Sequence, residues 1–121
     1  MSIQPLRNGE RVSIPNAAPV YLVLDGARHW IPNPTTYNNL FRDWNGIISS
    51  PDVNDIYLSY SLSDGAVLAK GAGDPVYLVS NGVKRWIISP SAMDKYHFNW
   101  DKIVQVPQVL LDGIQTGTNI E

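Results

Sequence analysis

The stretch PVYLVLDGARHWIPNP, residues 19–34, decides the fold, because it returns 56 positions later as PVYLVSNGVKRWIISP, residues 75–90. With this constant shift, residues 19–53 align with residues 75–109 without a gap, and thirteen of the 35 positions are identical. A repeat of this length indicates that each copy is one supersecondary unit whose apolar face is buried by the other copy. The repeat also provides an internal test of function, because a duplicated site needs its residues in both copies.

Each copy carries the signature of a β-hairpin followed by a short helix. Asp25-Gly26 and Asn81-Gly82 lie between β-forming residues, where Asp-Gly and Asn-Gly predict two-residue type I′ turns. Asn33-Pro34 and Ser89-Pro90 then predict an N-cap followed by proline in the first helical turn. Helices are therefore expected at about residues 34–41 and 90–98, and short strands after them at 44–48 and 100–104.

Three more Asn-Gly or Asp-Gly turns, at residues 8–9, 64–65 and 112–113, each precede a short apolar stretch. The opening strand is thus expected three times and the rest of the unit twice, with the last strand, 114–118, closing the sheet within the chain or in a second subunit. Copy one has an additional alternating segment, 55–62, which predicts an extra strand.

These patterns predict a single α+β, mostly β domain of two pseudo-symmetric units, each an antiparallel β-hairpin plus one short helix. Repeat one is placed at about residues 8–62, repeat two at 64–111, and a C-terminal closing strand at 112–120. The two units are expected to superimpose about a pseudo-twofold axis.

Composition excludes several classes of partner. The net charge is −2 and the nine Lys and Arg residues are scattered, whereas nucleic-acid binding needs a concentrated basic surface. No apolar run approaches the length of a membrane span. The N-terminus lacks the apolar region of a signal peptide, which leaves a cytoplasmic location, export by another route, or a removed signal open. The chain has no cysteine, so disulfides and thiolate sites are excluded.

The pattern of titratable residues argues against an enzyme. His29 aligns with Arg85 and His97 aligns with Phe41, so neither histidine is duplicated. Asp25 aligns with an asparagine, a change that keeps the turn but loses the charge needed for acid–base chemistry. The polar turn at residues 52–55 lacks the spaced glycine and distal glutamate of a calcium loop. We therefore expect no catalytic residue, no metal and no cofactor.

Aromatic residues are the candidates for a binding site. The predicted register places a tyrosine, a tryptophan and a cation on one face of each hairpin, and the cation is kept in both copies. The candidate ligand-binding residues are Tyr21, Arg28 and Trp30 in copy one, and Tyr77, Lys84 and Trp86 in copy two. The alternative is that these rings belong to the core, since cross-strand aromatic pairs stabilise sheets by themselves. Trp44 and Trp100 are expected to seal the helix onto the sheet as core residues.

The second copy resembles a known kind of repeat. The strings DGAVLAKG, residues 64–71, and VYLVSNGVKRWI, residues 76–87, are similar to short repeats of secreted bacterial cell-surface proteins, notably actinobacterial peptidoglycan amidases. The similarity extends over both copies, although copy one departs from the pattern at residues 27–29. The resemblance implies an accessory, non-catalytic module that holds a glycan or cell wall.

The function expected from the sequence is lectin-like, non-catalytic binding of cell-surface or cell-wall carbohydrate at two related sites. One alternative is a protein-interaction or structural module that docks by adding a strand to a partner's sheet. Another is a toxin or effector that uses the repeats to reach its target cell. A homodimer remains open as well. Exposure of Trp30 and Trp86 to solvent would favour a binding site over a core role for these rings.

Overall fold

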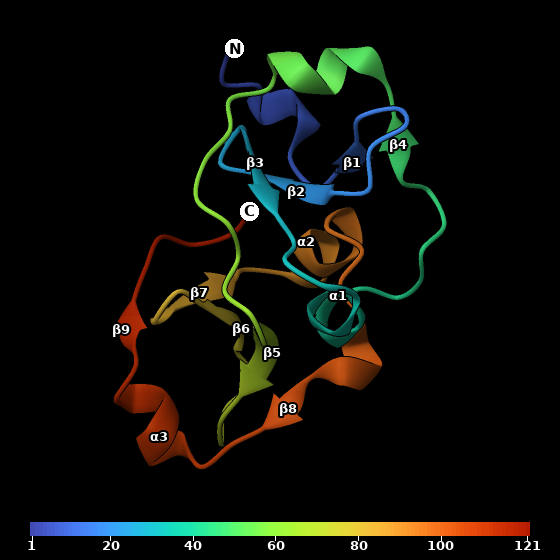
Figure 1. Cartoon of the computed structure of the whole chain (residues 1–121). Helices are drawn as coiled ribbons and strands as arrows, with labels where there is room; N and C mark the ends of the chain where they lie inside the picture. The colour runs from blue at the N-terminus through green and yellow to red at the C-terminus, as the bar shows by residue number, and fades with distance from the viewer.

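The computed structural model describes the whole chain, residues 1–121. Its fold is α+β and mostly β, with two mixed sheets and short helices (Figure 1). We call residues 8–62 unit one and residues 64–120 unit two. A 3₁₀ turn, η1 (Pro5–Arg7), precedes unit one, which contains β1 (Arg11–Ser13), β2 (Val20–Leu24), β3 (Ala27–Trp30), α1 (Pro34–Leu40), β4 (Ile48–Ser49) and η2 (Pro51–Asp55). Unit two contains β5 (Val67–Lys70), β6 (Val76–Ser80), β7 (Val83–Ile87), α2 (Pro90–Lys95), η3 (Trp100–Lys102), β8 (Val104–Gln105), α3 (Gln108–Asp112) and β9 (Gln115–Thr116).

The two sheets have the same strand order. The sheet of unit one runs β3-β2-β1-β4, and the sheet of unit two runs β7-β6-β5-β8 with β9 added beside β7. In both sheets the first three strands form an antiparallel meander, and the fourth strand pairs in parallel with the first. The sequence repeat is therefore a repeat of topology.

Both predicted hairpin turns are present. Asp25-Gly26 joins β2 to β3 and Asn81-Gly82 joins β6 to β7. All four turn residues have positive φ, between 56° and 76°, as a type I′ turn requires. Local turn chemistry is thus sufficient to specify the register of each hairpin.

The predicted helix starts are also present. Asn33 Oδ1 accepts a hydrogen bond from Thr36 N at 2.8 Å, and Ser89 Oγ accepts one from Ala92 N at 3.1 Å. Both helices are shorter than predicted, ending at Leu40 and Lys95. The strands that follow are also shorter and later than predicted, because the chain first forms a bend in unit one and η3 in unit two. No helix is both long and apolar enough to cross a membrane.

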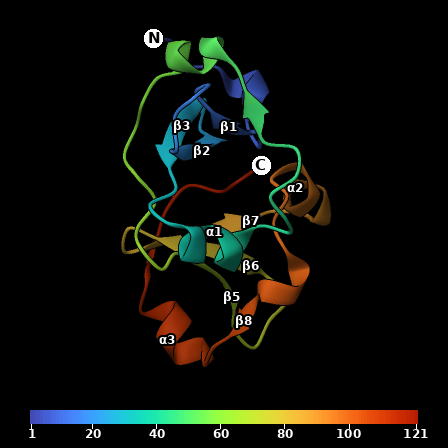
Figure 2. The same ribbon diagram turned by 45° about the vertical axis from the view of Figure 1, so that its right-hand side comes forward.

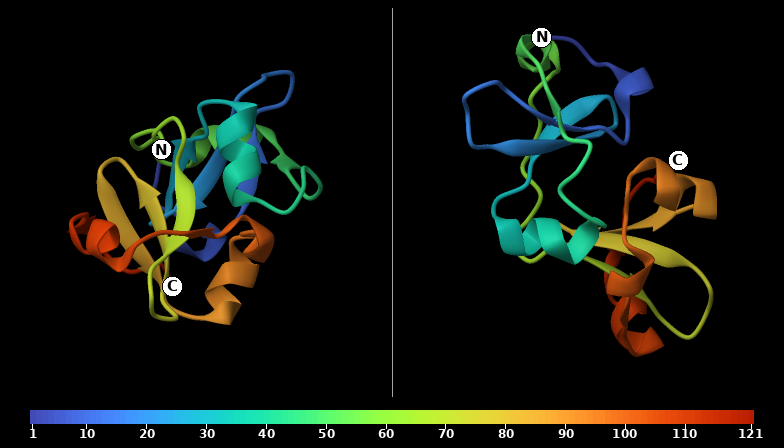
Figure 3. Two further views of the ribbon diagram at one scale, coloured as in Figure 1. Left: turned by 90° about the horizontal axis from the view of Figure 1, so that it is seen from below. Right: turned by 90° about the vertical axis from the view of Figure 1, so that its right-hand side faces the viewer.

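The helices interlock the two units. Helices α1 and α2 lie at the junction between the sheets (Figure 2) and on opposite sides of it (Figure 3). Helix α1 packs against β5 of the other unit, where Asn39 Nδ2 donates to Ala66 O at 3.3 Å. Helix α2 approaches Gly9 of unit one so closely that a Cβ there would collide with the carbonyl oxygen of Lys95. Each helix therefore covers the opening turn of the partner unit.

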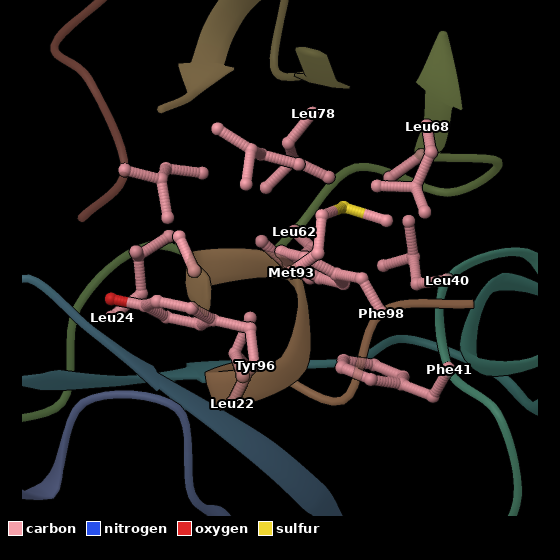
Figure 4. Close-up of a cluster of buried hydrophobic side chains, with 14 of the residues drawn as sticks. Leu22, Leu24, Leu40, Phe41, Leu62, Leu68, Leu78, Met93, Tyr96 and Phe98 are labelled. Carbon is pink, nitrogen blue, oxygen red and sulfur yellow. The ribbon is translucent and has the colours of Figure 1, made fainter. Parts of the chain in front are cut away.

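The main core is shared between the units. It contains 17 buried residues drawn from both sheets and from both helices, with Leu22, Leu68, Leu78 and Phe98 among those drawn in Figure 4. Neither unit can bury this apolar surface alone, which is the expected behaviour of a repeat whose copies stack on each other.

Polar contacts add to the junction. The guanidinium of Arg85 makes a bidentate pair with the carboxylate of Asp25 at the tip of the unit-one hairpin, with both N–O distances at 2.8 Å. His97 Nε2 lies 2.9 Å from Asp43 Oδ1, and Arg42 pairs with Asp94. The hydrogen bond to His97 is the main reason that the pKa of Asp43 is lowered. These acidic residues therefore serve the junction between units.

Two predictions about the strands need correction. Residues 55–62 form no regular strand; the segment makes isolated bridges, such as Leu58 with Arg28, while it crosses from unit one to unit two. The Asp112-Gly113 dipeptide is not the start of a third unit. Asp112 ends α3, and Gly113 has a negative φ of −76°, so no type I′ turn forms. Strand β9 then pairs in parallel with β7 and so completes unit two. Its counterpart in unit one is Leu58, which makes a parallel bridge to Arg28 of β3.

Candidate ligand-binding grooves

Two separate grooves occupy equivalent places in the two units. Groove one has a volume of about 290 Å³ and is lined by Ala18, Pro19, Val20, Trp30, Ile31, Asn33, Pro34, Tyr37 and Trp44. Groove two has a volume of about 500 Å³ and is lined by Lys70, Asp74, Pro75, Val76, Trp86, Ile87, Ile88, Ser89, Pro90, Met93, Trp100 and Ile103. Each of the nine residues of groove one has its counterpart 56 positions later in groove two. The grooves are thus duplicated together with the fold.

The hairpin and the helix N-terminus build each groove. The first strand of the hairpin supplies Val20 or Val76 to the floor, and the residue after the tryptophan supplies Ile31 or Ile87. The capped helix starts nearby, and its first residue, Pro34 or Pro90, also lines the groove. These are the positions at which local sequence signals are strongest, which explains why the two grooves occupy equivalent places.

Trp30 and Trp86 line the two grooves. They lie opposite Tyr21 and Tyr77 in the hairpin register, as the turns predict. Trp30 is 41% exposed and Trp86 is 39% exposed. Rings this large are normally buried when they serve only packing, so their exposure in both copies favours the binding interpretation over a core role.

Trp44 and Trp100 also line the grooves and are exposed, which corrects their prediction as core residues. Each is 46% exposed. The ring of Trp44 stacks on Tyr37, with centroids 3.8 Å apart, and its Nε1 donates to Asn38 Oδ1 at 2.9 Å. In unit two, Asp94 occupies the position of Asn38; a hydrogen bond from Arg42 is the main cause of its lowered pKa, and Trp100 adds a smaller contribution. The helix thus holds the ring of Trp44 in place, and both indoles remain about half exposed.

The duplicated cations, Arg28 and Lys84, do not line the grooves. Arg28 is 6% exposed and its Nε donates to Ile56 O at 3.0 Å. Lys84 is 8% exposed and its Nζ donates to Leu111 O at 2.8 Å and Ile114 O at 2.9 Å. In both units the cation satisfies carbonyl groups at the end of the short helix that follows the fourth strand, which explains its retention by stability alone.

The half-buried Tyr21 and Tyr77 belong with these cations. The guanidinium of Arg28 lies 4.8 Å from the ring centroid of Tyr21, and the ammonium of Lys84 lies 5.8 Å from that of Tyr77. Neither tyrosine lines a groove. Of the six predicted site residues, the structure brings Trp30 and Trp86 into the grooves and places the other four in two cation–π pairs outside them.

The structure assembles no group of three potential metal ligands from histidine, aspartate and glutamate side chains. His29 is buried, and its two ring nitrogens face the carbonyl oxygens of Tyr60 and Leu24 at 2.8 and 3.0 Å. Both histidines and the acidic residues at the junction thus have structural partners. What the grooves offer instead is flat aromatic surface.

Comparison with known proteins gives no relative for this chain: no family model, no curated protein and no solved structure matches it. The candidate site therefore rests on geometry. The residues that sequence reasoning missed are the second tryptophan pair, and the signal that could have found them is their identity in both copies, at Trp44 and Trp100.

Proposed function

We propose that this protein is a non-catalytic, lectin-like module that binds carbohydrate at two grooves, each lined by a pair of tryptophan rings. The single observation that carries the proposal is that all four tryptophans of the chain line the duplicated grooves and are 39–46% exposed there. The C–H faces of pyranose rings stack on such indole surfaces, while their hydroxyl groups stay near water or meet polar groups at the rim.

Pre-organisation supports the same proposal. The indole of Trp44 is held by Tyr37 and Asn38 before any ligand arrives, so little side-chain entropy is lost on binding. Two separate grooves on one chain also suit carbohydrate, because weak single sites gain strength through avidity on a multivalent surface. The resemblance to accessory repeats of bacterial cell-surface proteins points to cell-wall or cell-surface glycans as the class of partner.

Docking by strand addition has less support. The segment proposed to reach a partner, β9, pairs with β7 of its own chain. Three of the four edge strands, β4, β8 and β9, have two residues each, and short edge strands are poor templates for pairing with another chain. The fourth, β3, is already covered by the segment 57–62, whose backbone hydrogen-bonds to Arg28 and Trp30. A proline-rich peptide is the alternative occupant of the aromatic grooves, and a peptide array would reveal that outcome.

The test is binding of the fluorescently labelled protein to a glycan array, with Trp30→Ala, Trp86→Ala and the double variant. We expect each single variant to fold and to lose about half of the binding capacity, and the double variant to lose nearly all of it. Tyr57→Ala is the matched control, because this tyrosine is exposed but lies outside both grooves.

A second variant guards against loss of folding. Ala18→Phe adds a ring at the exposed rim of groove one without removing any packing, and it should block that groove alone. The proposal is overturned if the wild-type protein binds no glycan, or if the folded double tryptophan variant binds as well as the wild type.

A further inference from the structure

The two grooves differ in charge: groove two is lined by a lysine and an aspartate, whereas groove one is lined by no charged residue. We propose that groove two is the selective site, which recognises saccharide hydroxyl groups through Asp74 and Lys70, and that groove one binds mainly by stacking. This inference rests on the proposed carbohydrate-binding function and deepens it. It assigns to Asp74 and Lys70 the role of specificity-determining residues.

Lys70 reaches groove two from a position that is occupied by a short side chain in unit one. It stands opposite Val76 at the end of β5, and Val76 is part of the groove floor. The residue opposite the equivalent Val20 is Ser13, which does not line groove one. Lys70 therefore lines groove two without a counterpart in groove one.

Asp74 is the second addition. It lies in the exposed turn between β5 and β6 and lines groove two, where unit one has Ala18. The ion pairs of the protein join other residues, so neither the carboxylate of Asp74 nor the ammonium of Lys70 is neutralised by a partner. Both groups are therefore free to meet a ligand that enters groove two.

The polar side chains of groove one are already occupied. Asn33 accepts from Thr36 N and donates to Asp64 Oδ1 at 2.8 Å. The hydroxyl of Tyr37 donates to Asp43 O at 2.6 Å. Trp44 Nε1 is engaged by the neighbouring helix. Groove one thus offers flat apolar surface and few groups with which to tell one sugar from another.

The chemistry of Asp74 and Lys70 suits hydroxyl groups. A carboxylate accepts hydrogen bonds from two adjacent hydroxyls, and an ammonium donates to a hydroxyl or ring oxygen. Hydrogen bonds of this kind depend on whether each hydroxyl is axial or equatorial, whereas stacking on an indole requires only that one face of the sugar ring is free of axial hydroxyls. Groove two is also the larger groove, at about 500 Å³ against about 290 Å³, and so has room for a ring and its substituents.

The four indole N–H groups provide a separate readout for each groove. We would record ¹H–¹⁵N spectra during titration with the methyl glycosides of glucose, galactose and mannose and with N-acetylglucosamine, after assigning each signal with a Trp→Phe variant. We expect the Trp86 and Trp100 signals to respond at lower concentrations and to discriminate among the four sugars. The Trp30 and Trp44 signals should respond more weakly and to all four alike.

Exchanging the rim residues tests their role directly. Lys70→Ser with Asp74→Ala makes groove two resemble groove one, and should raise its Kd by about tenfold or more while groove one is unchanged. The converse variant, Ser13→Lys with Ala18→Asp, should strengthen groove one. All four positions are exposed or half-buried, so both variants should fold.

The outcomes distinguish failure of the inference about Asp74 and Lys70 from failure of the proposed carbohydrate binding. If the Lys70→Ser, Asp74→Ala variant leaves the Kd of groove two unchanged, or if both wild-type grooves bind the four sugars equally, the inference is overturned and carbohydrate binding stands. If no indole signal responds to any of the four sugars and the array shows no bound glycan, the proposed function itself fails.

Discussion

Lys84→Met separates a structural role for the duplicated cation from a role in ligand binding. Lys84 Nζ donates to two carbonyl oxygens, of Leu111 and Ile114, and the side chain is buried. Methionine keeps most of the length and the packing but leaves both carbonyls without this donor. Hydrogen bonds from charged groups contribute about 1.5–3 kcal/mol each, and relief of the buried charge offsets part of the loss.

We therefore expect the free energy of unfolding to fall by about 2–4 kcal/mol. In a domain of this size that corresponds to a drop in Tm of roughly 10 °C. Urea unfolding followed by tryptophan fluorescence measures the change. Arg28→Met should have about half the effect, because only one hydrogen bond, to Ile56 O, is lost. Lys102→Met is the control, since this lysine is exposed, and it should change stability by less than about 0.5 kcal/mol.

Glycan binding by the folded Lys84→Met protein should match the wild type, because the ammonium does not line groove two. The reasoning is refuted if the variant is as stable as the wild type but has lost binding. That result would mean that Lys84 contacts the ligand, as the sequence pattern predicts.

Two further predictions concern the junction between the units. Gly9→Ala should destabilise the protein by about 3 kcal/mol or more in thermal unfolding, because φ is +93° and the new Cβ would collide with the carbonyl of Lys95. Gly65→Ala is the control: φ is +81° but the space around it is open, so it should cost only about 1–2 kcal/mol. Equal effects of the two substitutions would contradict the contact between α2 and Gly9. The lowered pKa values of Asp43 and Asp94 mean that their stabilisation is present above the ordinary value of 3.8 and is lost as pH falls through the folded-state values. Urea unfolding of the Asp43→Asn, Asp94→Asn double variant should therefore depend less on pH than the wild type below about pH 4, and an unchanged pH profile would rule out this linkage.

The duplicated core explains which residues can differ between the copies. Arg11 donates to the hydroxyl of Tyr37 at 2.7 Å, and burial raises the pKa of that phenol. At the matching places unit two has Leu68 and Met93, both buried and apolar. Unit two thus has an apolar pair where unit one has a polar pair, whereas an apolar residue in place of Arg11 alone would remove the donor that reaches the buried Tyr37 hydroxyl.

Much of the fold follows from local chemistry that can be seen in the sequence. Asp25-Gly26 and Asn81-Gly82 allow positive φ at both turn positions, so the hairpins and their registers are predictable without tertiary contacts. Asn33 and Ser89 cap helices whose first residue is proline, so the helix starts are predictable too. The constant shift of 56 residues adds that both units share one topology.

The site was only partly predictable, because strand alternation tells which side chains share a face and not what covers that face. Arg28 and Lys84 share a face with the tryptophans, but η2 and α3 fold over the cations and leave Trp30 and Trp86 open. The same limit applies to Trp44, whose position after a helix is compatible with burial or with a groove wall.

The sequence by itself thus determined the repeat, the hairpins, the helix starts and the presence of duplicated tryptophans, because each depends on backbone preferences of a few neighbouring residues. Only the tertiary structure decided that β9 completes unit two, that the cations are internal and that four indoles line two grooves. These outcomes depend on segments far apart in the chain, brought together by burial of the shared core. Burial of apolar area is non-directional, so its result cannot be derived from the local pattern.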